Sequence, residues 1–229
     1  MMIQTMFEKL QCLPLLMGLS VDDLMDIVEK VKFEFNKYQD GHLIVAQGDK
    51  CDKIIYVLNG NLCTCKHDVN KSFMIYEYFN QEPYIIEPQN LWGMHQRFDR
   101  SYSFTSDGST CIINKRNINY LMSHYDIIKT NFLNMICNKL QYSTESLSNS
   151  LPHTTEEKLM FFIKHNKVGY YGQTEIKIKM QQLANIISDT RLNVSNVLNK
   201  WKRLGIAEIH RGNIILFDKK FFNNRIVSD

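Results

Sequence analysis

Two short helical patterns separated by a tight break lie between Lys179 and Trp201. Apolar residues recur at helical spacing in both patterns, so each is expected to bury one face. The apolar positions are Leu183, Ile186 and Ile187 in the first pattern, and Val194, Val197, Leu198 and Trp201 in the second. Thr190 ends the break and is a good N-cap residue for the second helix. This arrangement predicts a helix-turn-helix, and the alternative is an ordinary pair of core-packing helices.

The outward face of the second helix carries hydrogen-bonding side chains in place of the usual Glu and Lys. Arg can pair with guanine and Asn with adenine in the major groove, and the second helix of a helix-turn-helix contacts bases with its first residues. We therefore expect Arg191, the first residue of this helix, to be a candidate base contact. The candidate DNA contacts of this segment are Thr190, Arg191, Leu192, Asn193, Ser195, Asn196, Lys200 and Lys202.

The chain continues with two β-prone runs, residues 206–210 and 214–217, around the turn Arg211-Gly212-Asn213. Such a hairpin after a helix-turn-helix predicts a winged helix. Arg211 at the hairpin tip would contact a phosphate, as would the basic residues Lys200, Lys202 and Arg203 at the end of the preceding helix. Charge agrees with this assignment, because residues 152–229 carry 13 Lys and Arg against 7 Asp and Glu, whereas residues 1–151 carry 14 against 17.

The N-terminal half has a different pattern. Ser20 precedes an acidic helix start, and short β-prone runs separated by glycines then extend to about Ile113. Short strands at this spacing predict a β-barrel or β-roll. A helical stripe follows from Asp126 to about Leu147, and a helix of this length between two domains is typical of a dimer seam.

The segment from Ile44 to Gly60, IVAQGDKCDKIIYVLNG, resembles the β-roll signature of the Crp/Fnr family of bacterial transcription regulators. The match includes the Gly-acid turn at Gly48-Asp49, the apolar strand at 54–57 and the closing Gly60. The resemblance implies an α+β fold in three parts. These are a cyclic-nucleotide-binding-like β-roll sensor domain at 1–125, a dimerisation helix and hinge at 126–150, and a winged helix-turn-helix DNA-binding domain at 151–229.

The family also implies an effector pocket in the roll. Arg100-Ser101 stands where family members hold the cyclic phosphate, and Ser143-Thr144 stands where they contact the base. Gln89-Asn90 replaces the Gly-Glu pair that accepts the ribose hydroxyl, so Asn90 lacks the charged acceptor. We expect an anion site with weakened cyclic-AMP binding, under the control of another small effector or of none. In the alternative interpretation, Arg100 pairs with an acid such as Asp99 or Glu87 and holds the roll together.

Other chemistries have little support in the sequence. The six cysteines are scattered, which favours reduced thiols and does not match the closely spaced N-terminal thiolates of iron–sulfur sensors. No spacing singles out a haem ligand, so neither a metal nor a cofactor is expected. The sequence contains no P-loop, HExxH or GxSxG motif, and no enzyme is predicted. A stand-alone cyclic-nucleotide or haem sensing module that acts through a partner protein is the alternative function.

These features together predict a homodimeric transcription regulator. The expected partner is double-stranded DNA with a near-palindromic operator, and RNA polymerase is a further candidate partner. No apolar run approaches the roughly 20 residues that span a bilayer, and the N-terminus lacks a basic region before its apolar patch. We therefore expect a cytoplasmic protein without a membrane partner.

Overall fold

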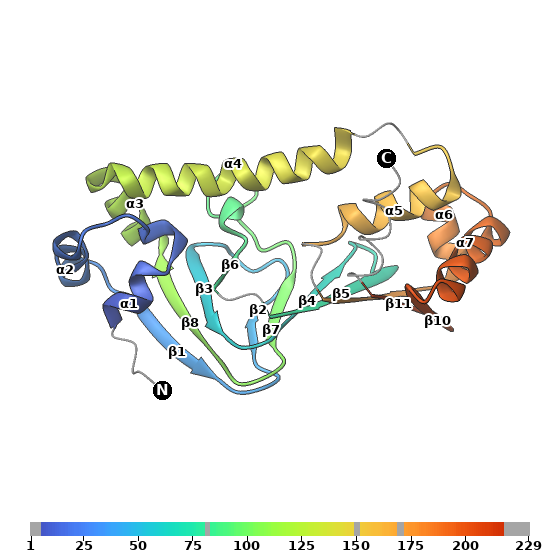
Figure 1. Cartoon of the computed structure of the whole chain (residues 1–229), viewed down its shortest axis with the longest axis horizontal. Coiled ribbons are helices and arrows are strands. Elements are labelled where there is room, and N and C mark those ends of the chain that lie inside the picture. The colour runs from blue at the N-terminus through green and yellow to red at the C-terminus, as the bar shows by residue number, and fades with distance from the viewer. Residues whose placement is uncertain (1–5, 81–82, 149–151, 169–171, 218–229) are drawn as a thin grey trace.

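The computed structural model describes residues 6–80, 83–148, 152–168 and 172–217. Figure 1 shows a β-roll with flanking helices in one half of the molecule and a helical domain with a hairpin in the other. The long helix α4 (Asp126–Ser148) lies across the roll. This is the predicted α+β fold, with a β-roll, a long helix and a C-terminal winged helix-turn-helix. None of the helices in the described ranges has the length and apolar character that crossing a membrane requires.

One sheet of the roll has four antiparallel strands in the order β1-β8-β3-β6. The strands are β1 (Glu34–Tyr38), β8 (Gly108–Asn114), β3 (Lys53–Asn59) and β6 (Tyr84–Ile86). The central run of β3 from Ile54 to Val57 is almost fully buried at every position. Burial on both faces explains why this strand is continuously apolar instead of alternating.

The helices of the N-terminal half cover the roll. They are α1 (Met6–Gln11), the short 3-10 turn η1 (Pro14–Leu16), α2 (Val21–Lys30) and α3 (Lys115–His124). Ser20 caps α2 in a reciprocal pair with Asp23, as its position predicts. Helix α4 buries Ile128 and Phe132 in the same core. The Asn131 side chain on α4 donates to the backbone carbonyl of Met17 at 2.8 Å, which ties α4 to the N-terminal segment.

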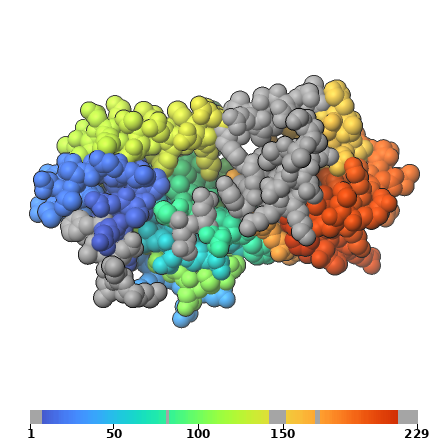
Figure 2. Space-filling model, viewed as in Figure 1, coloured from blue at the N-terminus to red at the C-terminus, as the bar shows by residue number. Residues whose placement is uncertain are grey.

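The C-terminal domain has the helix-turn-helix and hairpin that the sequence predicts. Its elements are α5 (Thr155–His165), β9 (Gln173–Ile178), α6 (Met180–Ile186), α7 (Arg191–Arg203), β10 (Ala207–His210) and β11 (Asn213–Phe217). Val194, Leu198 and Trp201 of α7 enter the domain core. Ile186 does not join the predicted buried face, because α6 ends there and its side chain remains 42% exposed. Figure 2 shows the red and orange residues of this domain at one end of the molecule.

A seven-stranded sheet joins the two halves, in the order β10-β11-β9-β5-β4-β7-β2. The roll contributes β5 (Phe73–Phe79), β4 (Leu62–His67), β7 (Ser101–Phe104) and β2 (Leu43–Val45). Strand β9 pairs antiparallel with β5 from Phe73 opposite Ile178 to Tyr78 opposite Gln173. Neither β9 nor this pairing is among the features predicted from the sequence. The pairing joins segments about a hundred residues apart in the chain, which leave no local signal for it.

The roll also supplies a side chain to the core of the winged helix. Ile75 on β5 is fully buried in the same hydrophobic cluster as Trp201, and it lies opposite Ile176 of β9. The C-terminal domain is therefore completed by a residue about a hundred positions earlier in the sequence.

We predict that Ile75→Ala destabilises the winged helix by about 2–4 kcal/mol, because it removes buried methyl groups and leaves a cavity. Urea unfolding followed by Trp201 fluorescence, in a Trp92→Phe background, measures the effect in that domain alone. The control is Met94→Ala, at a roll residue that is 94% exposed, which should change stability by less than about 0.5 kcal/mol. A Trp201 transition unchanged by Ile75→Ala would show that β5 does not complete this core.

Candidate nucleic-acid interface and roll pocket

The start of α7 is fixed by its cap and presents three exposed residues. The Thr190 hydroxyl accepts a hydrogen bond from the backbone N–H of Asn193 at 3.2 Å, as expected for an N-cap. Arg191, Leu192 and Asn193 then follow on the exposed surface. Leu192 is 70% exposed, which is unusual for a large apolar side chain in the first turn of a helix. The first turn of α7 is thus free to meet another molecule.

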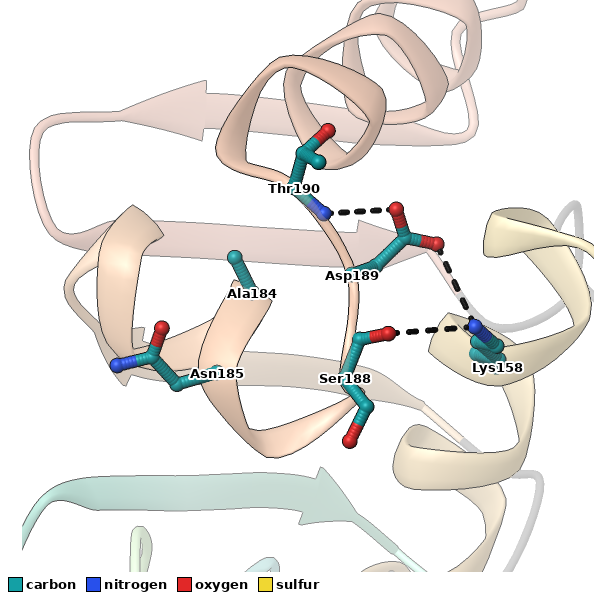
Figure 3. Close-up of a pocket in the computed structure, with 6 residues that line it drawn as sticks. All are labelled: Lys158, Ala184, Asn185, Ser188, Asp189 and Thr190. Carbon is teal, nitrogen blue, oxygen red and sulfur yellow. Dashed lines mark hydrogen bonds and ion pairs between the residues drawn. The ribbon is translucent and has the colours of Figure 1, made fainter.

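Asp189 organises the turn between α6 and α7 (Figure 3). One of its carboxylate oxygens accepts from the Thr155 hydroxyl at 2.7 Å, and the other accepts from the backbone N–H of Thr190 at 2.7 Å. Lys158 lies 3.7 Å from the carboxylate and also donates to the backbone carbonyl of Ser188. Ser188 has a φ of 53°, a left-handed conformation that reverses the chain between the helices. Asp189 therefore ties the start of α5 to the turn.

The structure separates the predicted DNA contacts into two groups. In the first group, side chains already have partners inside the domain. The Asn193 amide donates to Asp189 at 2.8 Å, and the Lys200 ammonium lies 2.9 Å from Glu156, which also accepts from the Trp201 indole. Asn199 donates to the Ser195 hydroxyl at 3.4 Å.

The second group is exposed on the outer surface of the domain. It comprises Arg191, Leu192, Asn196, Lys202, Arg203 and Arg211. Arg211 lies in the turn between β10 and β11, where Gly212 has a positive φ of 76°. These residues bring an apolar side chain, an amide and four guanidinium or ammonium groups to the end of the molecule. Such a set can contact both base edges and phosphates.

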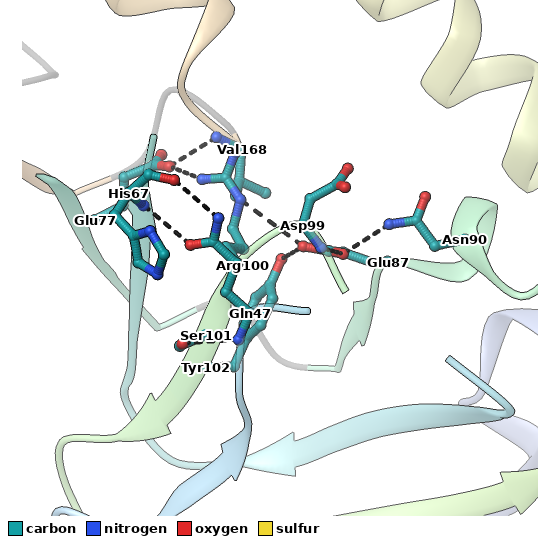
Figure 4. A network of polar contacts seen from close by, with 10 residues as sticks. All are labelled: Gln47, His67, Glu77, Glu87, Asn90, Asp99, Arg100, Ser101, Tyr102 and Val168. Carbon is teal, nitrogen blue, oxygen red and sulfur yellow. Dashed lines mark hydrogen bonds and ion pairs between the residues drawn. The ribbon is translucent and has the colours of Figure 1, made fainter. Parts of the chain in front are cut away.

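Arg100 in the roll is buried and faces two carboxylates (Figure 4). Its Nη1 lies 2.8 Å from Oε1 of Glu77, and its Nε lies 3.8 Å from Oε1 of Glu87. All three side chains are less than 10% exposed. An external anion at Nη1 or Nε of this guanidinium has to displace one of these carboxylates. The geometry thus matches the alternative interpretation, in which Arg100 pairs with acids of the chain.

Of the other predicted effector contacts, Asn90 is bonded to Glu87, whereas the described hydrogen bond of the Ser101 side chain is to the Gln47 backbone and not to the Arg100 group. Glu87 accepts from the Asn90 amide at 2.8 Å, from the backbone N–H of Asp99 at 2.6 Å and from the Tyr102 hydroxyl at 3.1 Å. Burial raises the pKa of Glu87 despite these donors. The Ser101 hydroxyl accepts from the backbone N–H of Gln47 at 2.9 Å.

Glu77 is the pocket residue that the sequence analysis missed. A signal for it exists in FMIYEYF, where strand alternation puts the single acid on the same face as Ile75. Ser143 and Thr144, the predicted base contacts, lie in α4, but their side chains are outside the described residues. The described ranges contain no cluster of three or more side chains suited to a metal ion.

We predict that Asp189 makes the helix-turn-helix sensitive to acid. Hydrogen bonds from Thr155, Asn193 and the Thr190 backbone hold the pKa of Asp189 at about 2, below its ordinary value of 3.8. A lowered pKa in the folded state stabilises the protein above about pH 4, and this contribution is lost as the pH falls toward 2. The difference in urea midpoint between the wild type and Asp189→Asn should therefore shrink from pH 6 to pH 2.5. A difference that is constant with pH would contradict the assignment.

The sequence matches no described protein family and no curated protein. Solved structures do match. The catabolite activator protein of Thermus thermophilus superposes with a TM-score of 0.50 at 15% identity, over 93% of this chain and 97% of that chain. A Eubacterium rectale protein described as a transcriptional regulator of the Crp/Fnr family has a TM-score of 0.49 at 15% identity, over 93% and 97% of the two chains. FixK2 from Bradyrhizobium japonicum has a TM-score of 0.43 at 11% identity, over 85% and 97%. The chain therefore has the fold of the catabolite activator protein, in agreement with the Crp/Fnr resemblance of its sequence.

Proposed function

We propose that this chain is a sequence-specific DNA-binding transcription regulator of the Crp/Fnr type. The observation that carries the proposal is the first turn of α7, where Arg191 and Leu192 are exposed behind a Thr190 cap at the outer end of the winged helix. The exposed cations Lys202 and Arg203 at the C-terminal end of α7, and Arg211 in the hairpin turn, supply phosphate contacts. Neither an enzyme nor a membrane protein is implied, and the regulator would act in the cytoplasm with RNA polymerase as a candidate partner.

The exposed face of α4 supports a homodimer. Leu133, Cys137 and Leu140 are exposed on this helix and are spaced four and three residues apart. That alternation is the spacing of a two-helix seam, and an exposed apolar stripe of this kind is stabilised by a second copy. A twofold axis between two chains would present two α7 helices to successive major grooves, about 34 Å apart. The operator should therefore be a near-palindrome.

The side chains around Arg100 favour an effector other than cyclic AMP, or regulation without an effector. Glu77 and Glu87 occupy the neighbourhood of Arg100, and Asn90 is bonded to Glu87. A cyclic phosphate would meet two carboxylates beside the one guanidinium. The effector is therefore a different small molecule, or the regulator works without one.

Selection of bound sequences from random duplex DNA tests the proposal. The full chain should enrich a near-palindromic site with half-sites about one helical turn apart or a multiple of it. Cyclic AMP should leave the enriched sequence and its affinity unchanged. Failure to enrich any sequence at low salt, where phosphate contacts are strongest, would reject DNA recognition by this chain.

We predict that Arg191→Ala weakens binding to the selected site by about 1–3 kcal/mol, because a bidentate contact to guanine is lost. It should also relax the preference at one base pair of each half-site. The matched control is Arg116→Ala, which removes the same charge from an exposed position on α3. Fluorescence anisotropy against the site and its single-base variants measures both effects. An unchanged preference at every base pair would refute the assignment of Arg191.

We predict that Leu192 contacts a thymine methyl group, since an apolar side chain can recognise that group in the major groove. Replacing the contacted thymine by deoxyuridine removes one methyl group, so wild-type binding should weaken by about 0.8 kcal/mol per half-site. Leu192→Ala should bind both DNAs equally, whereas Leu204→Ala, at the other end of α7 and 59% exposed, should still discriminate. If no thymine in the site shows this dependence on Leu192, the side chain does not read bases.

A further inference from the structure

Two alternate residues of strand β5 in the roll, Ile75 and Glu77, contact the winged helix. Ile75 and Glu77 are two residues apart, so their side chains lie on one face of the strand. Both are 1% exposed or less. Ile75 enters the winged-helix core, whereas Glu77 lies opposite Thr174 at the beginning of β9. A carboxylate is thus buried where the two domains share a sheet.

A single oxygen of Glu77 contacts both domains (Figure 4). Oε1 accepts from Nη1 of Arg100 at 2.8 Å, and the same atom accepts from the backbone N–H of Val168 at 2.8 Å. Arg100 precedes the roll strand β7. Val168 lies after α5, on the segment that leads to β9. The carboxylate therefore bridges the buried cation of the roll and the main chain of the winged helix.

The surroundings make this bridge strong. Hydrogen bonds to ionised groups are shorter and stronger than those between neutral groups, and a buried environment increases their strength. Glu87 is the other carboxylate near Arg100, and its contacts are with the roll residues Asn90, Asp99 and Tyr102. Glu87 thus supports the guanidinium from the roll, whereas Glu77 connects it to the winged helix.

We propose that Glu77 is a positioning residue that fastens the winged helix to the roll. Its charge pairs with Arg100, and the oxygen held there captures the Val168 amide on the segment between α5 and β9. The pairing of β9 with β5 begins beside Glu77, where Tyr78 lies opposite Gln173.

The role of Glu77 in orienting α7 toward DNA rests on the proposed function, whereas its role in attaching the winged helix to the roll does not. Two measurements keep them apart. Hydrogen exchange needs no DNA and reports the attachment. DNA affinity, measured at the selected site, reports the orientation of α7 toward DNA.

The exchange experiment uses the full chain and compares Glu77→Gln with Glu175→Gln. The control removes a carboxylate charge from β9 itself. Glu175 accepts from Tyr78 of β5 and from Asn213 and lies 3.7 Å from Lys177, so this control also removes a contact between β9 and β5 but leaves Arg100 and Val168 untouched. We expect amide exchange at Val168 and across β9 to rise about tenfold or more in Glu77→Gln relative to the control, a change of about 1.4 kcal/mol. Strand β3 and helix α7 should keep wild-type protection.

Two results would overturn the attachment. One is amide exchange at Val168 and in β9 that rises no more in Glu77→Gln than in Glu175→Gln. The other is an equal rise in β3 and α7, which would mean that Glu77 supports the whole fold. Should Glu77→Gln fail to fold, the double variant Glu77→Leu/Arg100→Met removes the pair together and leaves no unpaired cation. The same rise at Val168 and in β9 is expected for this double variant, and the same two results would overturn the proposal.

The affinity experiment uses wild type, Glu77→Gln and Glu175→Gln on one selected site. A positioning residue far from α7 should change affinity about threefold or more, because a loosened winged helix has to be ordered again on DNA. Equal DNA affinity in all three proteins would overturn the role of Glu77 in orienting α7, even if amide exchange increases in Glu77→Gln. If wild type selects no DNA, the proposed function fails while the exchange result still decides the attachment.

Discussion

The pairing of β9 with β5 is the constraint on which the arrangement of this molecule depends. Six residue pairs extend the sheet of the roll into the winged helix, and Ile75 crosses the boundary to complete the second core. A winged helix attached only by a linker could turn freely, but a shared sheet fixes its direction. The position of α7 at the outer end of the molecule follows from this sheet (Figure 1).

Two polar centres among the described residues have the same design. In each, one carboxylate accepts hydrogen bonds from donors on separate segments of the chain. Asp189 joins α5, the turn and α7, and thereby sets the position of the first exposed residues of α7. Glu77 joins the roll to the chain that enters β9. In both cases burying the acid costs desolvation, which the hydrogen bonds to its carboxylate offset. Asp189 fixes the turn before the exposed first turn of α7, and the proposed role of Glu77 is to hold the chain that leads to β9.

Features with a local signal could be predicted from the sequence. The N-caps at Ser20 and Thr190, the helical stripe of α4 and the hairpin around Arg211 depend on residues within a few positions of one another. Features formed by segments far apart in the sequence could not be predicted in this way. The run QTEIKI alternates as a strand should, yet nothing in it identifies β5 as its partner. For the same reason the sequence predicts an anion site at Arg100, with an acid such as Asp99 or Glu87 as the alternative partner, whereas no local signal connects Arg100 with Glu77, 23 positions earlier on a different strand.

Methyl NMR on the full chain with labelled isoleucines tests the shared sheet most directly. Ile75 and Ile176 lie opposite each other across β5 and β9, and both belong to the core that contains Ile214. The account predicts nuclear Overhauser contacts from the methyl groups of Ile75 to those of Ile176. Contacts from Ile75 to methyl groups of the roll alone would contradict it, because the winged helix would then be a separate domain that the roll does not position.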